Sequence, residues 1–256
     1  MATDTHTHVF KEVCSTYGLD LNHEISTINR DNYLSSVINV GLNIATSKEC
    51  VDIANNNEKF YASIGIHPLY IKGEDTEGLY SLVNDKVVAI GEIGLDLKDG
   101  SNYFEQREYL ILQIIAANVL HLPVIIHSNN ANKQVIEIFE KFVKPKYGCV
   151  FHCYQPDIEY LDYIIKNGFY VSFAGRVTFN NAKMSHEVLK RIPDHLYLIE
   201  TDSPFISPEP VRNEPGKSSS IIHVVNRIAD IKGVPRYVIE QQSDDNARRL
   251  FRKIKH

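Results

Sequence analysis

The chain has 256 residues, of which 43% are hydrophobic and 23% charged, so global disorder is excluded and a full hydrophobic core can form without disulfide bonds or structural metals. This length allows one or two domains, and a single α/β barrel is typically about 250 residues long. The formal net charge of −5 argues against a basic surface that binds nucleic acid generally, but it is compatible with a local phosphate-binding site.

Membrane and export signals are missing from the sequence. The longest apolar stretch, residues 110–120, is interrupted by Gln113 and Asn118 and is shorter than the roughly 20 apolar residues of a spanning helix. No basic segment followed by an apolar core opens the chain, and the four cysteines form no CxxC pair. We therefore expect a cytoplasmic protein with free thiols and no membrane partner.

Short apolar runs rich in β-branched residues recur along the chain. Because their apolar character is continuous rather than alternating, they predict strands that are buried on both faces, as in a parallel sheet. The runs are Ala2–His8, Val37–Asn43, Tyr61–His67, Val87–Leu95, Pro123–Ser128, Cys149–Tyr154, Tyr170–Ala174 and Leu196–Asp202.

Helical periodicity fills the segments between these runs. Apolar residues at i, i+3, i+4 and i+7 begin at Leu112, Val135 and Ile221, and each set predicts an amphipathic helix. Thr46 followed by Glu49 predicts a capping box. Residues 207–220, rich in Pro, Ser and Glu, predict a long loop after the last strand.

The alternation of strands and helices defines the expected fold class. The strand ends recur about every 22 to 35 residues, which suits one βα unit each. Eight such units over residues 1–256 predict a single (β/α)₈ TIM barrel, with its functional site at the C-terminal mouth of the strands.

Histidines and carboxylates gather at the predicted strand ends. Five of the 11 histidines fall there, whereas random placement would put on the order of one in so few positions. The set consists of His6, His8, His67, Glu92, His127, His152 and Asp202.

This set predicts a metal centre. His6 and His8 are two residues apart, so on a strand they project from the same face and can hold one ion. With His127, His152, Glu92 and Asp202 the donors are too many for one ordinary site but suit two divalent ions bridged by a carboxylate, for which Glu92 is the candidate. Imidazole and carboxylate donors suit Zn²⁺, Mn²⁺, Fe²⁺ or Mg²⁺. Asp202 could also accept a proton from the attacking water.

In their order and spacing, these segments resemble the TatD family of metal-dependent deoxyribonucleases, in the amidohydrolase-like TIM-barrel superfamily. The motifs are DTHTH, GIHP, GEIGLD, IHS, HCY and ETDSP, and the resemblance runs from Met1 to Asn246–Phe251. It implies two ions (Mg, Mn or Zn), held by His6, His8 and Asp202 and by His127 and His152, with Glu92 between them. It also implies that the substrate is DNA, as single strands or 3′ ends, trimmed from the 3′ end. A monomer is the default.

The remaining site residues concern the substrate. His67, Arg176 and Arg212 are candidate phosphate contacts, the arginines through their fork of donors. Asp96 could orient a ligand histidine, and Glu200 is expected to be an ordinary charge near the strand. The chain departs from the family pattern at three places. Positions 129 and 130 are Asn where Arg is usual, and residues 212–215 form a shorter version of the family's RGxxNEP loop. Arg176 occupies a loop where small polar residues are common. These changes concern substrate contacts rather than ligands.

Two other functions remain open. The protein could be a different amidohydrolase that acts on amides, lactones or small phosphoesters. Amidohydrolases that bridge their metals with a carboxylated Lys have that lysine in the fourth strand. Here the fourth predicted strand contains Glu92 and no lysine, which disfavours that subclass. A binding protein without catalysis is disfavoured because all six ligand positions are filled.

Overall fold

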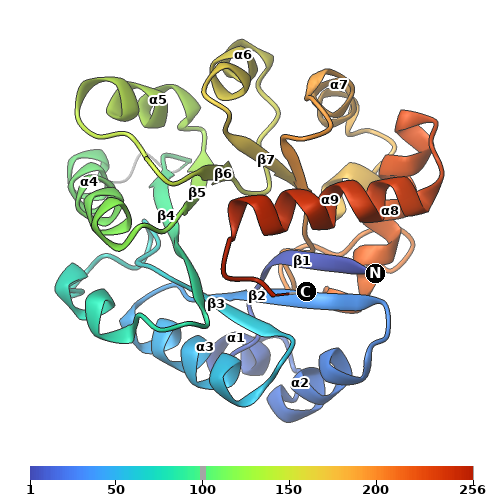
Figure 1. Ribbon diagram of the computed structural model, residues 1–256, viewed down its shortest axis with the longest axis horizontal. Coiled ribbons are helices and arrows are strands. Elements are labelled where there is room, and N and C mark those ends of the chain that lie inside the picture. The colour runs from blue at the N-terminus through green and yellow to red at the C-terminus, as the bar shows by residue number, and fades with distance from the viewer. Residues whose placement is uncertain (99–101, 256) are drawn as a thin grey trace.

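Eight parallel strands form one sheet in the order β1 to β8 in the computed structural model, which describes residues 1–98 and 102–255 (Figure 1). A bridge between Thr7 and Ser203 links the segment that follows β8 to β1, and β1 also contacts β8, so the sheet closes into a barrel. The strands are β1 (Ala2–Thr7), β2 (Leu34–Val40), β3 (Phe60–Ile64), β4 (Val87–Asp96), β5 (Val124–Asn129), β6 (Cys149–Phe151), β7 (Tyr170–Phe173) and β8 (Tyr197–Ile199). The expected (β/α)₈ barrel is confirmed.

Helices surround the barrel, as Figure 1 shows. The α-helices are α1 (Lys11–Thr16), α2 (Leu21–Arg30), α3 (Ile44–Asn56), α4 (Tyr103–Leu120), α5 (Asn132–Lys141), α6 (Ile158–Lys166), α7 (Lys183–Arg191), α8 (Ile221–Lys232) and α9 (Arg236–Leu250). Three 3₁₀ segments are described as well: η1 (Thr76–Leu82), η2 (Gly175–Thr178) and η3 (Ser218–Ser220). The expected loop over 207–220 is helical only at η3.

Two local predictions are corrected by the structure. The second strand begins at Leu34 and ends at Val40, earlier than the expected Val37–Asn43, because Asn43 already caps α3. The capping box pairs Asn43 with Thr46, not Thr46 with Glu49: Asn43 Oδ1 accepts from the Thr46 amide at 2.8 Å, and Thr46 Oγ1 accepts from the Asn43 amide at 3.0 Å. The Glu49 side chain instead accepts from the amide of Lys11.

The predicted helical stripes have different surroundings. Ile221, Val224, Val225 and Ile228 on α8 are all buried, as an amphipathic helix on a barrel requires. On α4, by contrast, Leu112, Ile115 and Val119 face solvent, while Leu110 and Ile114 pack inward. Of the set predicted on α4, only Ala116 is buried, so the periodicity is real but its large side chains mark the outer face.

Helix α9 runs across the end of the barrel where the strands begin (Figure 1). Asp244 on α9 accepts from Thr3 at the start of β1 and from Ser35 at the start of β2, and Gln242 accepts from the Tyr197 hydroxyl on β8. With α9 over the N-terminal ends, the opposite mouth is left for the functional site.

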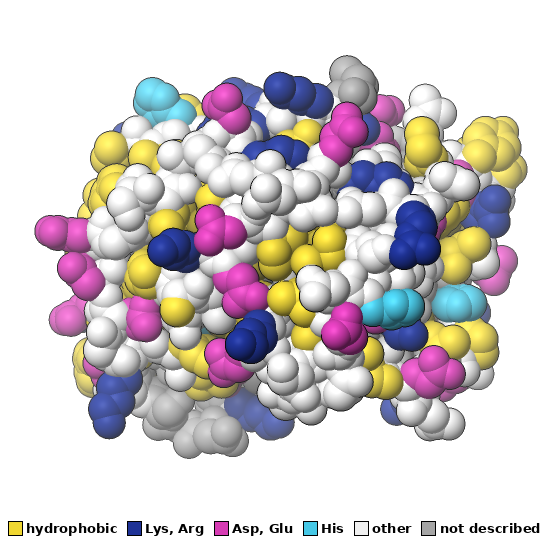
Figure 2. All heavy atoms as spheres, turned by 90° about the horizontal axis from the view of Figure 1, so that it is seen from below, with side chains coloured by type: hydrophobic (Ala, Val, Ile, Leu, Met, Phe, Trp, Pro, Cys, Tyr) yellow, Lys and Arg dark blue, Asp and Glu magenta, His cyan; other side chains and the backbone are white. Residues whose placement is uncertain are grey.

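The surface has no single dominant charge on the face shown in Figure 2, where Lys and Arg side chains are interspersed with Asp and Glu. This agrees with the modest net charge of −5. Among the residues that the structure describes, no helix combines the length and apolar character needed to cross a bilayer.

Candidate metal centre

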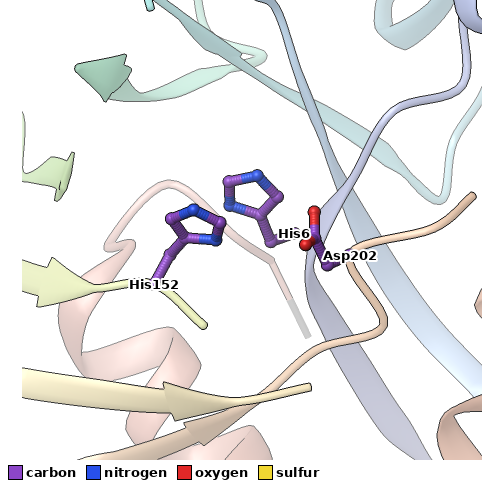
Figure 3. Close-up of side chains that lie close together, drawn as sticks. All are labelled: His6, His152 and Asp202. Atoms are coloured by element: carbon purple, nitrogen blue, oxygen red, sulfur yellow. The ribbon is translucent and has the colours of Figure 1, made fainter. Parts of the chain in front are cut away.

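The structure brings the six predicted metal ligands and His67 together at the C-terminal mouth of the barrel. Figure 3 shows His6, His152 and Asp202 converging from β1, from the end of β6 and from the segment after β8. Most of the cluster lines a cavity of about 220 Å³, whose walls are completed by Leu42, Leu69, Tyr70 and Phe205.

Two glycines of strand β4 allow the close packing on which the cluster depends. A Cβ at Gly91 would lie 2.6 Å from the Cβ of Ile125, and one at Gly94 would lie 1.9 Å from the carbonyl oxygen of His127. Gly94 also has a φ of +154°, which side chains other than glycine rarely adopt. β4 can therefore lie against β5, with Gly94 paired to His127 and the side chains of Glu92 and His127 in contact.

Glu92 is the centre of the cluster, and its two carboxylate oxygens face different partners. Oε2 lies 3.3 Å from His6 Nε2 and 3.8 Å from His8 Nε2. Oε1 lies 2.6 Å from His127 Nδ1 and 2.7 Å from His152 Nε2. One carboxylate thus stands between two pairs of imidazoles.

The electrostatics of the cluster favour ionised carboxylates. Burial acts to raise the pKa of Glu92, but the charge of His152 and hydrogen bonds from His127 and His152 outweigh it and hold the pKa well below its usual range. Burial likewise opposes ionisation of Asp202, and the hydrogen bond from His8 with the charge of His152 lowers its pKa overall. The pKa of His152 is raised well above its usual value because Glu92 and Glu200 overcome the effect of burial.

Hydrogen bonds to their other ring nitrogens orient two of the histidines. His8 Nδ1 lies 2.8 Å from the carbonyl oxygen of Val40, which fixes the proton on Nδ1 and turns the Nε2 lone pair toward Glu92. His127 Nε2 lies 3.0 Å from Asp96 Oδ2, so its Nδ1 faces the centre. The predicted orienting role of Asp96 matches this contact. Asn129, where the family usually has Arg, donates to the same Asp96 oxygen at 3.1 Å.

Glu200 is the site residue that sequence reasoning missed. It was expected to be an ordinary charge, yet it is 1% exposed, and its Oε1 accepts from the Cys153 amide at 2.7 Å. The same oxygen lies 3.4 Å from His152 Nδ1, on the side of the ring away from Glu92. Its position two residues before Asp202 in ETDSP was the available signal, but strand alternation alone does not place it, because β8 ends at Ile199 and Asp202 has a φ of +53°.

His67 lies beside Glu92, with its Nδ1 engaged by the backbone. Its Nδ1 accepts from the Leu69 amide at 3.2 Å, so the neutral ring carries its proton on Nε2, which lies 3.6 Å from Glu92 Oε1. Burial lowers the pKa of His67 to about 3, which keeps the ring neutral. A neutral N–H beside the cavity can donate to an oxygen of a bound molecule, and the role of His67 as a substrate contact stays a prediction.

The donor set fits divalent cations. His6 Nε2 and His8 Nε2 are 3.1 Å apart, within the roughly 2.9–3.4 Å that separates two nitrogens bound to one ion at about 2.0–2.1 Å. Asp202 Oδ1 lies 3.5 Å from His8 Nε2. Three overlapping donor groups have all their candidate ligand atoms within 4.8 Å of one another: His6, His8 and Glu92; His6, His152 and Asp202; and His67, Glu92 and His127.

The two arginines expected to bind phosphate lie outside this cavity. Arg176, on η2 after β7, is exposed, and Arg212 lies over the ring of Phe179 at 4.2 Å, with Glu209 3.6 Å from its Nη1. Both belong to segments that follow strand ends at the mouth, so their role as substrate contacts stays a prediction.

An eight-stranded parallel barrel that gathers histidines and carboxylates at the C-terminal ends of its strands defines the class of the protein. It is a metal-dependent hydrolase with a TIM-barrel fold.

Comparison with known proteins gives the family. The chain belongs to the TatD-related DNase family, whose model matches residues 3–252. It is 35% identical to YabD of Bacillus subtilis, described as an uncharacterized metal-dependent hydrolase, over 98% of this chain and 99% of that protein. The crystal structure of YjjV, a TatD homologue from Escherichia coli, superposes with a TM-score of 0.87 at 24% identity, covering 98% of each chain. A TatD family hydrolase from Entamoeba histolytica gives a TM-score of 0.81 at 20% identity, covering 99% of this chain and 98% of that one.

Proposed function

We propose that this hydrolase cleaves phosphodiester bonds in DNA at a two-metal site, trimming single strands or 3′ ends in the 3′-to-5′ direction. The observation that carries the proposal is the division of Glu92, with one oxygen toward His6 and His8 and the other toward His127 and His152. A shared carboxylate between two donor sets is the arrangement that two-metal phosphodiester hydrolysis uses.

Each donor set has a distinct role in the proposal. His6, His8 and Asp202 would hold one ion and His127 and His152 the other, with Glu92 common to both. Bound divalent ions, whether Mg, Mn or Zn, would activate water near neutral pH and stabilise charge on the attacking and leaving oxygens. Asp96 behind His127 and Glu200 behind His152 keep those rings turned inward.

The residues around the donors can position a nucleotide. Asp202, whose pKa is lowered overall although burial opposes this, is an ionised acceptor for the proton of the attacking water. His67 presents an N–H for a phosphate oxygen. Tyr70 and Phe205 line the same cavity and are 39% and 41% exposed, so a terminal base can stack on either ring.

The first test is a DNA degradation assay with end-labelled single strands and Mg²⁺, Mn²⁺ or Zn²⁺. A 3′-to-5′ exonuclease releases the label of a 3′-labelled strand at once, whereas a 5′-labelled strand shortens progressively; EDTA should stop both. Fragments of intermediate length from both substrates would indicate endonuclease cleavage. No cleavage with any of these metals, together with robust hydrolysis of an amide or lactone, would contradict the proposal and favour another amidohydrolase activity.

The second test removes the proton acceptor. Asp202→Asn should lower kcat on DNA by about 10²–10⁴-fold, because the amide cannot take the proton and is a weaker ligand. Asp162→Asn, on the outer face of α6, is the matched control and should leave kcat unchanged. Near-normal turnover by the Asp202 variant, with circular dichroism showing intact folding for both, would refute the assigned role.

A further inference from the structure

Helix α4 carries an apolar stripe on its outer face. Phe104, Leu112, Ile115 and Val119 are 69%, 49%, 44% and 64% exposed, and their spacing places them along one side of the helix. The opposite side, with Leu110 and Ile114, is buried against the barrel. A helix that is apolar on both sides is ordinarily buried on both sides.

The stripe continues onto the segment that follows α5, the next helix around the barrel (Figure 1). Phe142 is 59% exposed, and the guanidinium of Arg107 lies 5.5 Å from the ring centres of both Phe104 and Phe142, so these side chains form one surface. Beside Ile115 and Val119, residues 142–146 complete a groove of about 780 Å³.

We propose that this α4 stripe is the interface of a homodimer in which the α4 helices of two copies pack antiparallel about a two-fold axis near Leu112. The stripe is almost symmetric about that residue: Phe104 lies eight residues before it and Val119 seven after it. In an antiparallel pair, Phe104 of each copy therefore reaches the groove beside Val119 of the other. Such an interface is self-complementary and closed, as a two-fold dimer requires.

The exposed apolar area is of the size that a dimer uses. With about 150–250 Å² for each large side chain and the exposed fractions given above, Phe104, Leu112, Ile115, Val119 and Phe142 offer roughly 430–710 Å². A standard interface buries about 800 Å² per partner, and the largest apolar patch of a typical monomer, about 300–600 Å², is often functional. The stripe therefore supplies most of the surface area that one partner buries in a standard interface.

Charge supports the antiparallel direction. Glu105 lies in the first turn of α4 at the edge of the stripe, and Lys144 and Lys146 line the groove beside the last turn. Glu108 is exposed within the stripe, between Phe104 and Leu112. An antiparallel pair brings Glu105 of one copy to the lysines of the other at both ends, whereas a parallel pair would place like charges together. Complementary rims of this kind set the register of an interface.

Light scattering coupled to size exclusion tests the interface. The full chain should elute with twice its mass of 29.2 kDa, and Leu112→Glu or Val119→Glu should reduce this to the single mass because a charge is buried in the contact. Met184→Glu on α7, where the methionine is also 49% exposed, is the matched control and should remain dimeric. A wild-type chain that is monomeric at every concentration tested, or dimers that survive both α4 variants, would overturn the proposal.

Cysteine crosslinking tests the direction. Leu112→Cys should crosslink to its own copy, because the two positions meet at the axis. Phe104→Cys should not, since its two copies lie about 24 Å apart in an antiparallel pair at 1.5 Å per residue, but it should crosslink in a mixture with Val119→Cys. Efficient self-crosslinking of Phe104→Cys would show a parallel arrangement and overturn the antiparallel assignment.

Discussion

At the scale of single residues, the orientation of the site histidines depends on the groups that contact their outer ring nitrogens. The hydrogen bond from His127 holds the pKa of Asp96 at about 2, so Asp96 stays ionised and keeps His127 Nδ1 turned inward. Val40 does the same for His8 through its carbonyl group, and Glu200 stands behind His152. Outer partners of this kind fix the tautomer and increase ligand basicity.

Glu200 allows a direct test of this positioning role. Glu200→Gln keeps the shape but removes the charge behind His152, so metal affinity should fall about 10–100-fold by isothermal titration calorimetry. Activity should recover when the metal concentration is raised, which a damaged fold would not allow. Glu209→Gln, on the exposed loop after β8, is the control. Unchanged metal affinity of the Glu200 variant would show that Glu200 serves only the Cys153 amide.

At the scale of elements, the start of helix α3 has the capping box that the sequence predicts, but Thr46 pairs with Asn43 and not with Glu49. Thr46 does belong to a capping box, but as its third helical residue, with Asn43 as the cap. Asn43 is in an extended conformation, as a cap should be, and the Thr46 hydroxyl also accepts from the Leu42 amide at 2.9 Å. The reciprocal bonds therefore fix the turn that leads out of β2.

This reassignment predicts the result of a stability experiment. Asn43→Ala removes the acceptor for the Thr46 amide and should lower the free energy of unfolding by about 0.5–2 kcal/mol in urea denaturation. Glu49→Ala, which leaves the box intact, should cost less. Equal losses for the two variants would mean that the Asn43–Thr46 bonds do not stabilise the helix.

At the scale of the whole molecule, helix α9 ties the end of the chain to its beginning. Asp244 accepts from Thr3 and Ser35 at the starts of β1 and β2, and from Arg248 on its own helix. Burial opposes ionisation, but these three bonds outweigh it and lower the pKa of Asp244 below 3.8. The closed end of the barrel therefore depends on an ionised carboxylate.

The sign of this shift predicts how stability changes with pH. Because the folded pKa is lower than the unfolded one, the contribution of Asp244 is complete above about pH 4 and is lost as the pH falls through the folded pKa. Asp244→Asn should therefore be less stable than the wild type at pH 7, by about 1–3 kcal/mol in urea unfolding, and the difference should shrink below pH 4. A difference that stays constant across this range would exclude the ionised network.

The sequence by itself determined the barrel and the cluster of residues at its mouth. Short continuous apolar runs rich in β-branched residues favour strands covered on both faces, and parallel strands place their C-terminal ends together, so residues as distant as His6 and Asp202 were expected to meet. Short-range patterns also located α8 and the turn before α3. These inferences hold because they rest on periodicity and on the geometry of a repeating unit.

Only the tertiary structure decided which groups face which. The division of the Glu92 oxygens, the proton on His67 Nε2 and the position of Glu200 behind His152 depend on contacts between different strands, which no local pattern encodes. The outward direction of the stripe on α4 is of the same kind: periodicity shows that one face is apolar, but the packing of the helix on the barrel decides whether that face meets the core or the solvent.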